Sequence, residues 1–162
     1  MINTRSGTFF QGAVAGAAGG LAEIAWVSLY AGMTGGDPAT LARGVTTAAG
    51  VSALLPASPV ALGVAVHMTL AVALGIALAS AWRAMRQYQP ALTNPYPVML
   101  AALAGVWAIN FFVVLPIVSP AFVHMVPYAV SLTSKLLFGA AAAATVRRDS
   151  AARLLPSHVR GG

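Results

Sequence analysis

The chain has 162 residues, of which 59% are hydrophobic and only 7% are charged, and its mean hydropathy is +0.81. A soluble domain carries about 25% charged residues, so this chain has too few polar side chains to cover a water-soluble fold. Cysteine is absent, which excludes disulfides, cysteine-ligated metals and thiol catalysis. The net charge of +6 comes mostly from arginines outside the apolar segments, which indicates contact with lipid headgroups and not with nucleic acid.

The first apolar segment covers residues 9–30, is rich in Ala and Gly and is interrupted only by Glu23. It exceeds the ~18 residues that cross a bilayer, so we predict a retained spanning helix and not a cleaved signal peptide. In the connection that follows, Asp37 precedes Pro38, which is typical of a helix N-cap and first turn. We therefore predict a short interfacial or re-entrant helix over residues 38–49.

Three further apolar segments are long enough to span the membrane, and they cover residues 59–82, 98–118 and 121–146. Only the short Pro116–Pro120 segment separates the last two, so we expect an antiparallel hairpin there. The predicted fold is an all-α integral membrane protein, a single domain with a bundle of four transmembrane helices. A basic cytoplasmic tail at residues 147–162 completes it.

Arginines predict the orientation of these helices, because cytoplasmic loops are enriched in Arg and Lys. Only Arg43 falls on the opposite side of the predicted topology from the other arginines, which are Arg5, Arg83, Arg86, Arg147, Arg148, Arg153 and Arg160. We therefore predict a multi-pass protein of a bacterial-type inner membrane with both termini in the cytoplasm.

Small residues mark the faces through which the helices are expected to pack. The first segment contains a repeated small-xxx-small pattern, which lets a second backbone approach closely. Glu23 lies seven residues after Gly16 and is expected to project from the same face into the helix interface. The predicted packing residues are Gly12, Gly16, Gly19, Gly20, Gly63, Gly75 and Gly139.

Polar residues inside the apolar segments predict a buried cluster. His124, Tyr128, Ser131 and Lys135 are spaced four, three and four residues apart and would form one stripe on the fourth helix. With a rise of ~1.5 Å per residue, most of the cluster falls roughly 10–12 Å below the non-cytoplasmic face, whereas Lys135 falls at about 21 Å. The predicted members are Glu23, His67, Asn110, His124, Tyr128, Ser131 and Lys135.

An isolated charge at such depth costs at least ~2.5–3.5 kcal/mol, so we expect either a Glu23–Lys135 ion pair or a neutral Glu23 bonded to His67. Interhelical hydrogen bonds worth only ~0.6 kcal/mol on average are the favoured role for Asn110, Tyr128 and Ser131. Ionisable groups at depth favour a function, and Glu23 with His67 is therefore a candidate site for proton transfer.

Two cofactor hypotheses arise from the histidines. His67, His124 and Glu23 offer donors for a transition metal, and His67 with His124 is the minimum for bis-histidine ligation of haem b. The predicted depths of the two histidines, ~12 Å and ~5 Å, differ more than opposite axial ligands should. We rank the absence of a cofactor first, metal second and haem third.

Catalytic patterns such as a Ser-His-Asp set, a phosphate loop or HExxH do not occur, so we expect no catalytic activity of its own. The first functional interpretation is an accessory or structural subunit of a larger membrane complex, for example a respiratory or photosynthetic one. The alternative is a small proton or metal-ion transporter that uses the Glu23–His67 site, and the third is a haem-binding membrane anchor. Expected partners are the lipid bilayer and either other membrane subunits or further copies of the chain.

Overall fold

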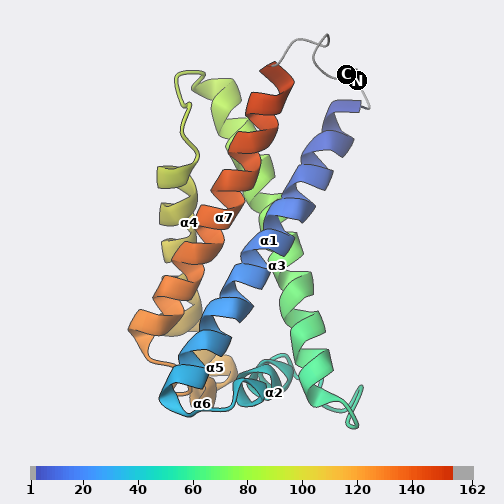
Figure 1. Cartoon of the computed structure of the whole chain (residues 1–162), viewed down its shortest axis with the longest axis vertical. Coiled ribbons are helices and arrows are strands. Elements are labelled where there is room, and N and C mark those ends of the chain that lie inside the picture. Colours follow the sequence, from blue (N-terminus) through green and yellow to red (C-terminus); the bar gives the residue numbers. More distant parts are fainter. Residues whose placement is uncertain (1–2, 155–162) are drawn as a thin grey trace.

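The computed structural model describes residues 3–154, and it describes side chains over residues 7–148. All regular secondary structure in this range is helical, and four segments are long and apolar enough to cross a membrane. Three of them are α1 (Asn3–Thr34), α3 (Pro59–Tyr88) and α7 (Tyr128–Leu154). The fourth joins α4 (Tyr96–Ile109), the π-helix η1 (Asn110–Val114) and α5 (Leu115–Val118). The predicted all-α membrane fold with four spanning helices is thus confirmed (Figure 1).

The four spans are arranged around a central pair of helices, α1 and α7. α1 packs against both α3 and α7, and α4 packs against the other side of α7. The N-terminal end of α1 and the C-terminal end of α7 lie at the same end of the bundle (Figure 1). Two shorter helices, α2 (Pro38–Ala48) and α6 (Pro120–Val123), lie at the opposite end. Helix α1 is therefore the element through which α3 and α7 are held together.

Helix α2 begins where Asp37 and Pro38 predict a helix start. The Asp37 carboxylate accepts a hydrogen bond from the Ala39 amide at 2.9 Å and pairs with Arg43 at 2.8 Å. The Ala39 bond and then the Arg43 side chain hold the pKa of Asp37 below its ordinary value. Thr46 anchors the other face of α2, because its buried hydroxyl donates to the Pro59 carbonyl at 2.7 Å.

Close helix contacts explain the glycines of α1. A Cβ added at Gly12 would lie 2.5 Å from the Cα of Ile76, and one at Gly16 would overlap the Ala71 carbonyl of α3. On the neighbouring face, a Cβ added at Gly19 would lie 2.6 Å from the Phe138 ring of α7. The two faces of α1 therefore serve different neighbours, and each contact needs a residue without a side chain.

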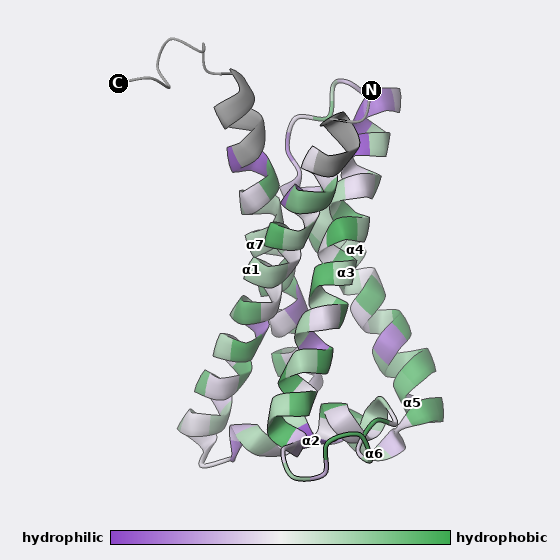
Figure 2. Ribbon diagram, turned by 90° about the vertical axis from the view of Figure 1, so that its right-hand side faces the viewer, coloured by the Kyte–Doolittle hydropathy of each residue, from purple (hydrophilic) through white to green (hydrophobic). Residues whose placement is uncertain are grey.

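A core of small and large apolar residues joins all four spans. Phe138, Leu103 and two alanines of α7 are fully buried in it. Its members are Ala15, Ala71, Ala79, Trp82, Met99, Leu103, Phe138, Ala142, Ala143 and Val146. Outside this core the helices present mostly apolar side chains, and hydrophilic positions are conspicuous at the end where α1 begins, with others inside the bundle (Figure 2). This distribution is that of a protein surrounded by lipid.

The start of the fourth span differs from the prediction. The apolar run begins near residue 121, but α7 begins at Tyr128, after α6 and a turn. Pro127 is the cause, because proline disfavours the helical conformation in the residue before it and lacks an amide hydrogen. His124 is consequently the C-cap of α6 and does not belong to α7.

The third span is also less regular than an apolar run suggests. The Leu115 amide donates to the Asn110 carbonyl, which is the five-residue spacing of a π-helix. Pro116 has no amide hydrogen for the Phe112 carbonyl, and its ring crowds the preceding turn. The helix accommodates this proline by widening one turn, and Asn110 marks where the widening begins.

Most other helix ends extend beyond the predicted spans. α1 and α3 run past residues 9–30 and 59–82 at one or both ends, and α4 begins at Tyr96. Polar residues such as Arg83 and Arg86 continue α3 without breaking it. The predicted ends are too short because hydropathy locates only the apolar part of a helix, whereas backbone hydrogen bonds extend the helix into the polar residues that follow.

Candidate functional site

The carboxylate of Glu23 is the centre of a polar site between three helices. Its side chain is only 4% exposed, and its Oε1 lies 2.7 Å from the Nζ of Lys135. The hydroxyl of Ser134 donates to the same oxygen at 3.1 Å. Two neighbouring residues of α7 therefore bind one carboxylate oxygen of α1 and compensate its burial.

His67 of α3 lies on the other side of this carboxylate. Its Nε2 is 3.6 Å from Oε2 of Glu23 and 3.4 Å from the carbonyl oxygen of Gly20. The side chains of His67 and Lys135 are 25% and 21% exposed, so part of each is not covered by the rest of the protein. We call Glu23, His67, Ser134 and Lys135 the carboxylate site, and it connects α1 with both of its neighbours.

The position of Lys135 along its helix differs from the sequence-based expectation. Because α7 starts at Tyr128, Lys135 stands seven residues into the helix, which is about 10.5 Å along it. His67 stands eight residues into α3, or about 12 Å. The Glu23–Lys135 ion pair, one of the two arrangements expected from the sequence, forms with a distance of 2.7 Å.

A second group of contacts surrounds the start of α7. The indole nitrogen of Trp107 donates to the Ser131 hydroxyl at 3.0 Å, and this hydroxyl donates to the Tyr128 carbonyl. The Trp107 ring packs against Phe111, Phe112 and Tyr128 with centroid distances of 5.6, 5.4 and 6.2 Å. Ser131 and Tyr128 thus take part in an aromatic cluster beside the π-helix and make no recorded contact with Glu23.

Asn110 and His124 lie elsewhere. Asn110 opens the π-helix, and no side-chain hydrogen bond of it is found within the described part of the chain. His124 is exposed at the C-cap of α6. Of the seven residues predicted to cluster, the structure brings Glu23, His67 and Lys135 together.

Sequence reasoning missed two contacts that hold these helices. Ser134 binds Glu23, and the indole of Trp26 donates to the Val130 carbonyl at 3.0 Å, which ties α1 to the first turn of α7. Ser134 lies four residues before Phe138, which packs on Gly19 of α1. This spacing places both residues on the face of α7 toward α1, a relation that becomes visible only once Phe138 is known to contact Gly19.

The structure brings together only part of the donor set that the sequence offers for a metal, so the metal hypothesis stays a prediction. Among the described residues, no group of three or more His, Asp or Glu side chains is close enough to hold an ion. His67 and Glu23 do meet, but His124 is on a different segment at the C-cap of α6. The ring nitrogen of His67 faces Gly20 and Glu23, and the pairing of His67 with His124 around haem stays a prediction.

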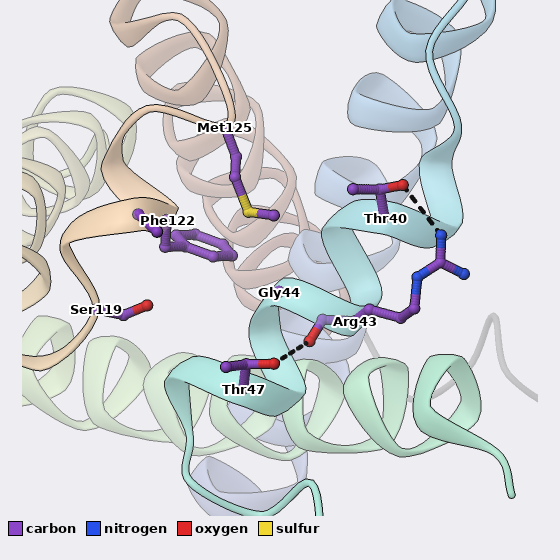
Figure 3. Close-up of a pocket in the computed structure, with 8 residues that line it drawn as sticks. Thr40, Arg43, Gly44, Thr47, Ser119, Phe122 and Met125 are labelled. Carbon is purple, nitrogen blue, oxygen red and sulfur yellow. Dashed lines mark hydrogen bonds between the residues drawn. The ribbon is translucent and has the colours of Figure 1, made fainter. Parts of the chain in front are cut away.

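A groove of about 200 Å³ lies between α2 and the α5–α6 region, at the end opposite the start of α1 (Figure 3). Phe122 and Met125 pack over Gly44, and Arg43 lies at the rim with its guanidinium bonded to Thr40. The lining residues are Thr40, Arg43, Gly44, Thr47, Ser119, Ala121, Phe122 and Met125. Its mostly apolar lining contains no residue of the carboxylate site.

Fold and site together define a multi-pass helical membrane protein with an ion pair buried inside its transmembrane bundle. Comparison of the chain with protein-family models, curated proteins and solved structures finds no match.

Proposed function

We propose that this protein is a structural, accessory subunit of a larger membrane assembly, in which the Glu23–Lys135 pair holds α1 against α7. The observation that carries the proposal is that the charge of Glu23 is compensated within the chain, by Lys135 and Ser134. A buried pair of this kind holds helices in one arrangement, because removing one partner leaves an uncompensated charge and costs about 3–5 kcal/mol.

The rest of the bundle supports the same interpretation. Within the described part of the chain, no buried side-chain nitrogen or oxygen lacks a hydrogen-bond partner. Large apolar side chains such as Leu21, Leu70 and Ile109 are exposed on the outside of the helices. The interior is thus satisfied by the chain itself, and the outer surface suits lipid or the apolar helices of partner subunits.

The test compares single and double substitutions of the ion pair in the full chain, extracted gently from its own membrane. Glu23→Gln and Lys135→Met should each reduce the fraction that co-purifies with partner subunits in native mass spectrometry, because each leaves one charge unpaired. The Glu23→Gln/Lys135→Met double variant should recover much of the loss.

Breaking the exposed Asp37–Arg43 pair with Arg43→Gln is the matched control and should leave assembly unchanged. A wild-type spectrum without partner subunits would contradict the proposal.

A second candidate function, a proton carrier, is favoured by the contact of His67 with the free oxygen of Glu23. The side chain of His67 is a quarter exposed whereas Glu23 is enclosed, so a proton passing through the site would reach Glu23 by way of His67. In proteoliposomes, a carrier would show proton flux that is lost in His67→Asn and in the Glu23→Gln/Lys135→Met variant. Flux that persists in the double variant excludes a carrier role for Glu23.

A further inference from the structure

Arginines gather at the end of the bundle where α1 begins. Arg83 and Arg86 belong to the last turns of α3, and Arg147 and Arg148 follow the apolar part of α7. The Arg83 guanidinium bonds the Thr8 hydroxyl of α1, whereas Arg86, Arg147 and Arg148 are exposed. Hydrophilic residues are visible at this end in Figure 2.

Two of these arginines border the same packed core. Arg86 lies one turn after Trp82, and Arg147 follows Val146, and both Trp82 and Val146 are buried in the core that joins the four spans. Tyr96 of α4 packs against this core and presents its ring to the guanidinium of Arg147 at 5.8 Å. The Arg147 side chain is therefore held in place by a cation–π contact and not free in solvent.

The positive charge at this end is not compensated by the described acidic side chains. Glu23 pairs with Lys135 inside the bundle, and Asp37 pairs with Arg43 at the opposite end. Within the described range, Arg86, Arg147 and Arg148 form no ion pair. Asp149 is the one further acidic residue of the sequence, and its side chain lies outside that range. The arginines thus outnumber the acids around this rim.

We propose that Arg86, Arg147 and Arg148 bind the phosphate of an anionic phospholipid at this end of the bundle. Guanidinium groups bind phosphate oxygens through two parallel hydrogen bonds, and arginines at a membrane surface attract anionic headgroups. The site stands at the ends of apolar spans, with Met85 and Tyr88 exposed beside Arg86, so acyl chains find apolar surface next to the headgroup. These neighbours favour a lipid over a free phosphate ion, and the inference holds for either proposed function.

The test is native mass spectrometry of the full chain in detergent, titrated with phosphatidylglycerol and, separately, with phosphatidylcholine. Each arginine near an anionic lipid surface adds to the free energy of lipid binding. Arg86→Gln/Arg147→Gln should therefore weaken phosphatidylglycerol binding roughly 30-fold, equivalent to about 2 kcal/mol. Phosphatidylcholine binding should not change. Arg86→Lys/Arg147→Lys keeps the charge but not the paired hydrogen bonds, so it should bind phosphatidylglycerol more tightly than Arg86→Gln/Arg147→Gln and more weakly than the wild type, which separates a charge effect from misfolding.

Arg43→Gln is the control, because it removes an arginine from the opposite end of the bundle. An equal loss of phosphatidylglycerol in this control, or unchanged binding in Arg86→Gln/Arg147→Gln, would overturn the proposal. Displacement of the lipid by inorganic phosphate at similar concentration would show a site for free anions and would overturn the assignment to lipid.

Discussion

Glu23 shows what a single carboxylate requires in the middle of a spanning helix. One oxygen binds Lys135 and Ser134, and the other faces His67, so all of its close polar partners come from other helices. A charge without such partners would be expensive in an apolar medium, and the partners therefore determine which helices can lie next to α1.

The contribution of Ser134 can be measured separately from that of the ion pair. Ser134→Ala should lower the free energy of unfolding by about 1.5–3 kcal/mol, because the hydroxyl donates to a charged, buried acceptor. Thr133→Ala is the neighbouring control, since its hydroxyl bonds only the Ala129 carbonyl of its own helix, and it should change stability little. Denaturant titration in detergent micelles measures both, and equal effects would count against a specific role for Ser134.

At the scale of elements, backbone proximity decides which glycines matter. Gly16 lies directly against the Ala71 carbonyl of α3, whereas a Cβ at Gly32, in the same helix, would meet no atom within 4 Å. Both residues carry the same helix propensity, so any difference in their substitution energies reports packing.

Gly16→Ala is expected to destabilise the bundle by about 1–3 kcal/mol, because the added methyl group forces α1 and α3 apart. Gly32→Ala should be neutral or stabilising by about 0.5–1 kcal/mol, the usual gain from replacing glycine within a helix. Thermal unfolding of the two purified variants in the same detergent measures the difference. If Gly16→Ala unfolds at the same temperature as Gly32→Ala, the close crossing of α1 and α3 is refuted.

At the scale of the whole molecule, the helices place the α2 region and the α3–α4 loop at opposite ends of the bundle (Figure 1). The distribution of arginines predicts that the end with α2 faces away from the cytoplasm.

The absence of native cysteine allows a direct test with single reporters. Thr40→Cys in α2 and Gln89→Cys after α3 should react with a membrane-impermeant maleimide from opposite sides of sealed vesicles. With vesicles whose cytoplasmic face points outward, Gln89→Cys should be labelled and Thr40→Cys should not. Ala142→Cys, at a fully buried position, is the unreactive control. Labelling of both reporters from one side would contradict the four-span topology.

The sequence by itself determined the class of fold, because uninterrupted apolar runs of this length satisfy their backbone polar groups in lipid as spanning helices. It also determined that Glu23 must find a partner, since the cost of an isolated buried charge does not depend on the details of the fold. The start of α2 at Asp37 and Pro38 could also be predicted from the sequence, because a helix cap depends only on neighbouring residues.

Only the tertiary structure decided which polar residues meet. Pro127 delays α7 to Tyr128, and this shift moves His124 out of the helix. Packing of α1 against α7 brings Lys135 within 2.7 Å of Glu23. Hydropathy did not reveal that break, because the residues on either side of it are as apolar as a helix interior. Ser131 and Tyr128 lie apart from Glu23 because α4 and α1 pack against different faces of α7. The spacing of residues within one helix does not predict which neighbouring helix each face will contact.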